Sequence, residues 1–153
     1  MWTATQLERL RLESAILIQA GLTQFSINHD ASRNSYYASG YATSSSGKRY
    51  FLYIPVPNGF PNERPPMYLT DPHPLLMRDG TRISSLGVSH IMLTLDPYPN
   101  GMIQLCHWRQ NKWHAKIYLY QVLLKGLLWI EAYEQHLETG RPLADFVLTM
   151  SEA

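Results

Sequence analysis

The hydrophobic residues near the start of the chain recur at helical spacing. The stripe consists of Leu7, Leu10, Ser14 and Leu17. Thr5 and Glu8 have the spacing of a capping box, in which each side chain accepts a hydrogen bond from the other residue's backbone amide. Gly21 follows the stripe and readily adopts the left-handed conformation that ends a helix. These features predict a helix over residues 5–20.

From Leu22 onward the hydrophobic period changes to two. Clusters of turn-forming residues separate alternating segments at residues 22–28, 36–43, 49–56 and 65–70. In the third segment one face is predicted to carry Tyr50, Leu52, Ile54 and Val56. Gly40 within the second segment is a candidate for a β-bulge. Because short turns join the segments in series, the pattern predicts a four-stranded antiparallel meander.

Residues 71–114 are rich in proline and glycine and have no period, which predicts a long irregular connection. Such a connection inside a compact domain is usually functional. Residues 118–137 return to helical spacing, with Gly140 and Pro142 as stop signals. The predicted apolar face of this helix consists of Leu119, Val122, Leu123, Leu127, Ile130 and Leu137. Residues 142–150 are expected to add a short turn or helix, and the fold class is α+β.

The composition narrows the class of protein. The 153 residues are expected to form one domain, and the 45% hydrophobic content and four tryptophans are typical of a globular protein. A net charge of +1 gives no reason to expect binding to nucleic acid or to an acidic membrane surface. No secretory signal is visible, and the longest apolar run, residues 117–130, is too short to span a bilayer. We therefore expect a cytoplasmic protein without a cofactor.

The single cysteine, Cys106, is the main candidate for chemistry. It lies in an apolar and aromatic segment, residues 101–108, and a thiol can carry an acyl group as a thioester. The simpler interpretation is a buried structural cysteine, because free cysteine is among the most buried residue types. A metal site made from Cys106, His107 and His114 lacks a fourth ligand and standard spacing. The tryptophans Trp108, Trp113 and Trp129 are expected to serve packing.

The order of the elements, together with the sequence FPNERPP at residues 60–66, resembles the ubiquitin-conjugating enzyme (UBC) fold. In that family a YPxxPP-like element joins the third and fourth strands. A cysteine then follows a glycine on a loop, and a tryptophan comes a few residues later. Here the corresponding residues are Gly101, Cys106 and Trp113. The resemblance covers residues 5–142 and is to the bacterial branch of the family, found in antiviral defence operons including the CBASS type.

The resemblance implies a transferase. Cys106 would accept a protein C-terminus from a separate activating (adenylating) protein and pass it to a protein acceptor. The carried group would be a ubiquitin-like protein or the C-terminus of the cyclic-nucleotide synthase (CD-NTase). The family's His-Pro-Asn element is absent as such, and the nearest candidates are His90 and Asn100. Asn100 would donate to the oxyanion, and His90 would order the loop or assist proton transfer. The simpler interpretations are a Pro-Asn-Gly turn and a structural histidine.

The family also uses its first helix and its proline-rich loop to contact partner proteins. The corresponding candidates are Leu7, Arg9, Arg11 and Pro61. For the two arginines, a solvated helix face is the default expectation.

Two other functions remain open at this stage. The first is a catalytically silent binding module of the same fold, like the related RWD domains, which keep the proline turn but lack the cysteine. The second is a cysteine hydrolase that pairs Cys106 with His90 or His114. Hydrolases normally place the nucleophile at a helix N-terminus, whereas the long helix here is predicted to begin several residues after the thiol.

Overall fold

The computed structural model describes residues 1–83, 93–95 and 103–147. Its helices are α1 (Ala4–Gln19), α3 (Leu119–Thr139) and α4 (Ala144–Val147), with a 3-10 turn η2 (Gln110–Lys112). Its strands are β1 (Phe25–Asp30), β2 (Ser35–Thr43), β3 (Arg49–Val56), β4 (Met67–Asp71), β5 (Leu93–Leu95) and β6 (Ile103–Leu105). Among these residues no helix combines the length and apolar character needed to cross a membrane.

The strands form one antiparallel sheet in the order β1-β2-β3-β4-β6-β5. The predicted meander of the first four strands is confirmed. The prediction that residues 71–114 are irregular throughout was wrong, because β5 and β6 lie within them and extend the sheet to six strands. In β6 both Ile103 and Leu105 are buried, and Leu105 lies opposite Met67 of β4. A strand of three residues is too short to show a hydrophobic period, so whether it forms depends on its pairing with neighbouring strands.

The start of α1 differs from the predicted capping box. The N-cap is Thr3, whose hydroxyl accepts from the Gln6 amide at 3.1 Å, while the Gln6 side-chain oxygen accepts from the Thr3 amide at 2.9 Å. The Gln6 side-chain nitrogen also donates to the carbonyl oxygen of Phe60 at 2.8 Å. This tertiary hydrogen bond favours the Thr3 cap over the predicted pair Thr5 and Glu8. The helix ends before Gly21, which has the expected positive φ of 79°.

Gly40 is not a bulge. It pairs in regular register with Phe25 on one side and Leu52 on the other. A Cβ atom at this position would lie 2.2 Å from the carbonyl oxygen of Gln24. The residue is therefore a glycine because the backbone just before β1 approaches it closely, which is a tertiary constraint.

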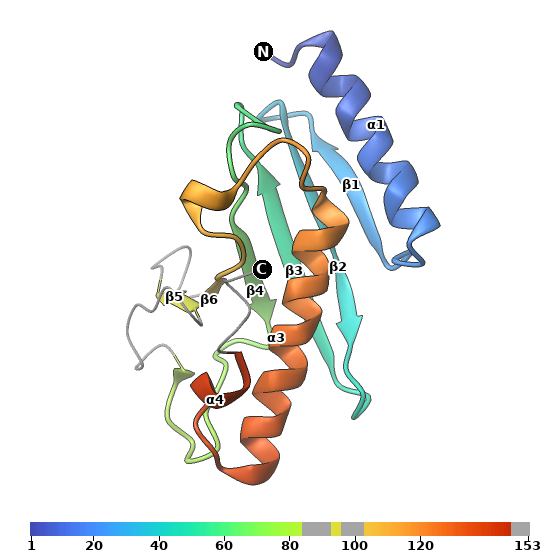
Figure 1. Cartoon of the computed structure of the whole chain (residues 1–153). Helices are drawn as coiled ribbons and strands as arrows, with labels where there is room; N and C mark the ends of the chain where they lie inside the picture. The colour runs from blue at the N-terminus through green and yellow to red at the C-terminus, as the bar shows by residue number, and fades with distance from the viewer. Residues whose placement is uncertain (84–92, 96–102, 148–153) are drawn as a thin grey trace.

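The core lies between the sheet and α3, which runs across one face of the sheet, whereas α1 lies beside β1 at its edge (Figure 1). The predicted inner face of β3 is confirmed, since Tyr50, Leu52, Ile54 and Val56 are all buried. In α3, Leu127 and Leu137 are only partly buried, whereas Trp129 is completely buried. Gly126 permits this close packing, because a Cβ there would lie 2.9 Å from side-chain atoms of Leu52 and Met67. Gly140, at φ 78°, ends α3 as predicted.

Candidate functional site

Cys106 directly follows β6, and it is partly exposed. Its neighbours Leu105 and His107 are buried, with 1% and 2% of their surface exposed. Because β6 pairs with β4, the sheet fixes where the cysteine leaves the core. Cys106 is thus not one of the fully buried structural residues, as the simpler interpretation would have it.

Two segments far apart in the sequence meet beside the cysteine. We call residues 57–66 the proline loop and residues 106–113 the cysteine segment. The hydrogen bonds that join them run from His107 Nε2 to Pro65 O (2.6 Å), from Arg64 Nη1 to Trp108 O (2.7 Å) and from Trp113 Nε1 to Pro61 O (2.9 Å). The FPNERPP sequence therefore does more than bend the chain between two strands. It also holds the conformation of the segment that carries the thiol.

Aromatic packing strengthens this junction. The rings of His107, Trp108 and Trp113 contact one another edge to face, with centroids 6.0 to 6.3 Å apart. Trp113 is 8% exposed and Trp129 is completely buried, as expected for packing residues. Such aromatic pairs stabilise a fold by about 0.5–1.5 kcal/mol each beyond the area they bury. The cysteine segment is thus held by side chains as well as by its backbone.

His107 is neutral in this environment. The pKa of His107 is lowered to about 4, mainly by burial; the hydrogen bond to Pro65 raises this pKa, and the charges of Arg64 and Lys125 contribute to lowering it. Because the Pro65 carbonyl can only accept, Nε2 carries the proton. The other ring nitrogen, Nδ1, is buried without a hydrogen-bond partner in the part of the chain that the structure describes.

His107 should make stability depend on pH. Its pKa rises from about 4 in the folded protein to about 6.5 on unfolding, so the unfolded state binds more protons between these values. Stability from this group is therefore present above pH 6.5 and lost as the pH falls toward 4. We expect His107→Gln, whose amide can still donate to Pro65, to remove about 2 kcal/mol of the stability difference between pH 7 and pH 4.5. Urea unfolding of both proteins at the two pH values measures this, and equal pH dependence would contradict it.

A lysine on α3 also contacts the cysteine segment. Lys125 is 6% exposed, and its ammonium nitrogen lies 4.1 Å from the ring centroid of Trp108. Burial lowers the pKa of Lys125. In the sequence this residue only interrupts the apolar run of a helix. Its position under an indole ring was not predictable from that pattern.

Of the residues predicted to assist Cys106, only His114 lies in the described part of the chain. His90 and Asn100 lie outside the described residues, so their roles stay predictions. His114 is exposed, and its Nδ1 accepts from the Lys116 amide at 3.3 Å. Among the described residues no group of three or more His, Cys, Asp or Glu side chains is placed to hold a metal ion. The long helix α3 begins only at Leu119, so Cys106 does not have the helix N-terminus that a hydrolase would use.

Arg9 is not on a solvated helix face, contrary to the default expectation. It forms an ion pair with Glu13 at 2.7 Å and donates to the carbonyl oxygen of Ile117 at 2.9 Å. Its guanidinium also lies 4.2 Å from the ring centroid of Tyr118. Glu13 is completely buried and accepts from the Leu119 amide at 2.8 Å. The sequence analysis missed Glu13, whose only signal was its spacing of four residues from an arginine.

Burial has a larger effect on the pKa of Glu13 than the groups that hydrogen-bond to it. Burial raises the pKa of its carboxyl group, while the hydrogen bonds from Arg9 and the Leu119 amide lower it. In contrast, Arg11 pairs with Glu8 at the surface, where both side chains are more than 70% exposed, at 72% and 73%. Of the two arginines, only Arg11 therefore remains available to a partner protein.

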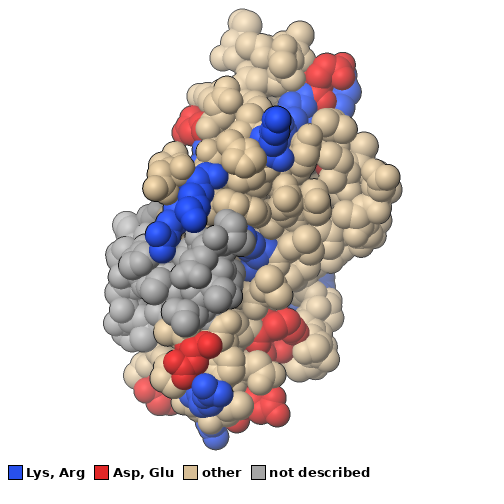
Figure 2. All heavy atoms as spheres, viewed as in Figure 1, with Lys and Arg blue, Asp and Glu red and all other residues tan. Residues whose placement is uncertain are grey.

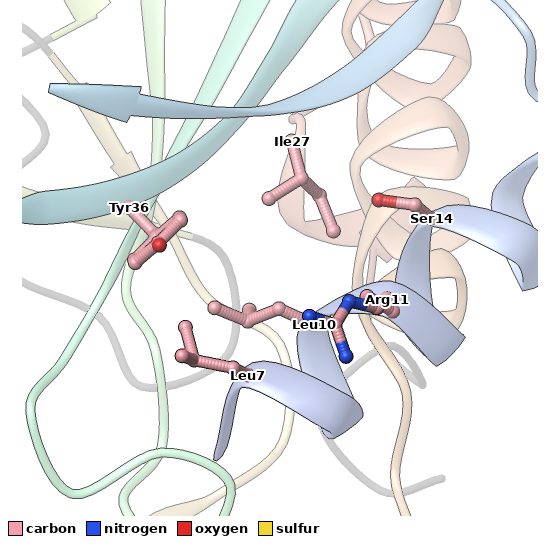
Figure 3. Close-up of a pocket in the computed structure, with 6 residues that line it drawn as sticks. All are labelled: Leu7, Leu10, Arg11, Ser14, Ile27 and Tyr36. Atoms are coloured by element: carbon pink, nitrogen blue, oxygen red, sulfur yellow. The ribbon is translucent and has the colours of Figure 1, made fainter. Parts of the chain in front are cut away.

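A pocket of about 270 Å³ lies between α1 and the strands β1 and β2 (Figure 3). Its lining consists of Leu7, Leu10, Arg11, Ser14, Ile27 and Tyr36. Two of the predicted partner contacts, Leu7 and Arg11, thus lie together at one hollow. The pocket is separate from Cys106, because β1 and β6 are four strand spacings apart, about 19 Å.

Exposed basic side chains follow the cysteine. Arg109, Lys112 and Lys116 are exposed, and none of them forms an ion pair within the described ranges. The sequence contains no acidic residue from position 97 to position 130. Figure 2 shows basic side chains across the middle of the face in view, whereas acidic and basic side chains occur together towards its upper and lower ends. An acidic surface on a partner protein would favour docking beside these cations.

The fold and the site define an α+β domain that presents a partly exposed cysteine beside a proline-rich loop. Comparisons with protein-family models, with curated proteins and with solved structures found no significant match.

Proposed function

We propose that this chain is a ubiquitin-conjugating-type transferase that carries a protein C-terminus as a thioester on Cys106. The observation that supports this function best is the junction between the proline loop and the cysteine segment. The two motifs that carry the family resemblance are about forty residues apart in the sequence, yet three hydrogen bonds join them. The helix–meander–helix order of the fold is consistent with the same family.

The chemistry needs few groups beyond the sulfur. The Cys106 sulfur attacks the carbonyl carbon of the activated C-terminus, and the activating group leaves with its electron pair. An amine of the acceptor then attacks the thioester carbonyl, and the sulfur leaves as a thiolate. Because a thiolate is both a good nucleophile and a good leaving group, most of the rate comes from positioning. The junction with the proline loop supplies that positioning.

The resemblance also indicates the partners. A separate adenylating protein activates the C-terminus, and the carried group is a ubiquitin-like protein or the CD-NTase of a bacterial antiphage CBASS system. The reaction takes place in the cytoplasm without a cofactor. The exposed cations of the cysteine segment and the pocket beside α1 offer two separate surfaces for these proteins.

The test is a loading reaction with the purified chain, its candidate activating protein, the candidate carried protein and ATP. We expect an adduct on a non-reducing gel that disappears with a thiol reductant and does not form with Cys106→Ala. Since the chain has one cysteine, only one thiol can form the adduct. A stable complex of the three proteins without any adduct would contradict the transferase.

That outcome would instead support a catalytically silent binding module of the same fold. The pocket lined by Leu7 and Arg11 favours this second candidate, because it lies far from Cys106 and needs no thiol to bind a partner. The two functions therefore predict different effects of Cys106→Ala. The module would bind its partners unchanged, whereas the transferase would lose its adduct.

A further inference from the structure

The side chain of Gln6 joins the first turn of α1 to the proline loop. Its Nε2 donates to the carbonyl oxygens of Asn58 at 2.7 Å and Phe60 at 2.8 Å, while its Oε1 accepts from the Thr3 amide at 2.9 Å. Because carbonyl oxygens only accept and a backbone amide only donates, the side-chain amide of Gln6 has one possible orientation. The helix cap uses its oxygen, and the proline loop uses both of its N–H groups.

The proline loop contacts the cysteine segment next to the place where Gln6 binds it. Phe60, whose carbonyl oxygen accepts from Gln6, is followed by Pro61, whose carbonyl oxygen accepts from Trp113 Nε1 at 2.9 Å. Two further hydrogen bonds join the loop to the two residues that follow Cys106. Among the described residues, Gln6 is the only side chain outside these two segments that hydrogen-bonds to the loop.

The same face of α1 also binds the chain that follows the cysteine segment. Arg9, one turn after Gln6, donates to the carbonyl oxygen of Ile117 at 2.9 Å. Glu13, one turn further, accepts from the Leu119 amide at 2.8 Å. Positions 6, 9 and 13 have the spacing of one helix face. This face therefore contacts both the loop that holds the cysteine segment and the chain that leaves it.

We propose that α1 positions Cys106 through the proline loop and that Gln6 is the positioning residue. Without the two N–H donors of Gln6, the carbonyl groups of Asn58 and Phe60 turn to water and the loop moves away from α1. The cysteine segment is hydrogen-bonded to the loop, so it moves as well and exposes the thiol. As a contribution to acyl transfer this inference rests on the proposed function. As a property of the folded chain it does not.

Two substitutions at position 6 separate this role from helix capping. Gln6→Glu keeps the oxygen that accepts from the Thr3 amide and suits the N-terminus of a helix, but it loses both donors to the loop. Gln6→Lys keeps N–H donors for the loop, but it loses the capping oxygen and places a cation at the helix N-terminus. If Gln6 served only to stabilise α1, Gln6→Glu would be the milder change. Positioning of the loop predicts the opposite order.

The first measurement is the rate at which iodoacetamide alkylates Cys106 at about pH 8, near the ordinary pKa of a thiol. We expect Gln6→Glu to react about three to ten times faster than the wild type, because losing ordinary hydrogen bonds favours the open loop by about that factor. Gln6→Lys should stay within about twofold of the wild type. Tyr50→Phe is the matched control and should react like the wild type, because it removes a hydrogen bond to Glu134 at the other end of β3.

The second measurement is hydrogen exchange of the Trp113 indole N–H, which donates to Pro61. This exchange should be about ten times faster in Gln6→Glu than in Gln6→Lys. Equal alkylation of Cys106 in Gln6→Glu and the wild type, or equal acceleration in Gln6→Glu and either Gln6→Lys or Tyr50→Phe, overturns the inference. If Gln6→Glu does not fold, Gln6→Met, which also lacks both donors, takes its place with the same expected result. If the thiol and the indole respond as expected but no adduct forms with the partner proteins, the positioning role stands and the proposed transferase fails.

Discussion

Replacing Cys106 with serine is expected to change the loaded adduct from one that a thiol reductant removes into one that survives it. The serine hydroxyl can attack the activated carbonyl from the same position, but it forms an oxygen ester. Because a hydroxyl is far less ionised than a thiol at neutral pH, loading should slow by more than about a hundredfold. An alkoxide is also a poor leaving group, so transfer to the acceptor should fall below detection. Reducing and non-reducing gels over time measure both effects.

Because the chain has a single cysteine, no other thiol can form the adduct in the serine variant. Cys106 is only partly buried, so the serine variant should fold with a stability within about 0.5 kcal/mol of the wild type. Urea unfolding provides that control. If the serine variant still forms an adduct that a thiol reductant removes, the bond does not involve this residue. In that case the proposed thioester on Cys106 is wrong.

Replacing Arg9 with methionine should destabilise the protein by about 3–5 kcal/mol, since it leaves the buried Glu13 carboxylate without its cation. The same change removes the hydrogen bond to the Ile117 carbonyl oxygen and the contact with the Tyr118 ring. Arg9 therefore joins α1 to the segment that precedes α3. The free energy of unfolding in urea, measured at pH 7, gives the size of the effect.

Arg11→Met is the matched control on the same helix. Arg11 pairs with Glu8 at the surface, so its loss should cost less than about 0.5 kcal/mol. Adding Glu13→Gln to Arg9→Met should recover about 2 kcal/mol, because the neutral amide can still accept from the Leu119 amide without a buried charge. Similar stabilities for Arg9→Met and Arg11→Met would show that the buried pair does not contribute as described.

The sequence alone determined the elements whose signal is local. Helical spacing and the stop at Gly21 placed α1 to within one residue at each end. Alternation and turn residues predicted the meander β1 to β4, including the buried face of β3. The only thiol of the chain and the proline-rich turn were visible as the likeliest carriers of chemistry. Hydrophobic period and backbone preference act over a few residues, so they can be recognised from the sequence alone.

The tertiary structure decided everything that depends on a partner distant in sequence. It pairs β6 with β4, moves the cap of α1 to Thr3 and buries Glu13 against the Leu119 amide at the start of α3. It also brings the proline loop to the cysteine segment and Lys125 to Trp108. A three-residue strand, a buried carboxylate and a shielded lysine have no local signature. Their stability comes from contacts that exist only once the sheet and α3 have packed together.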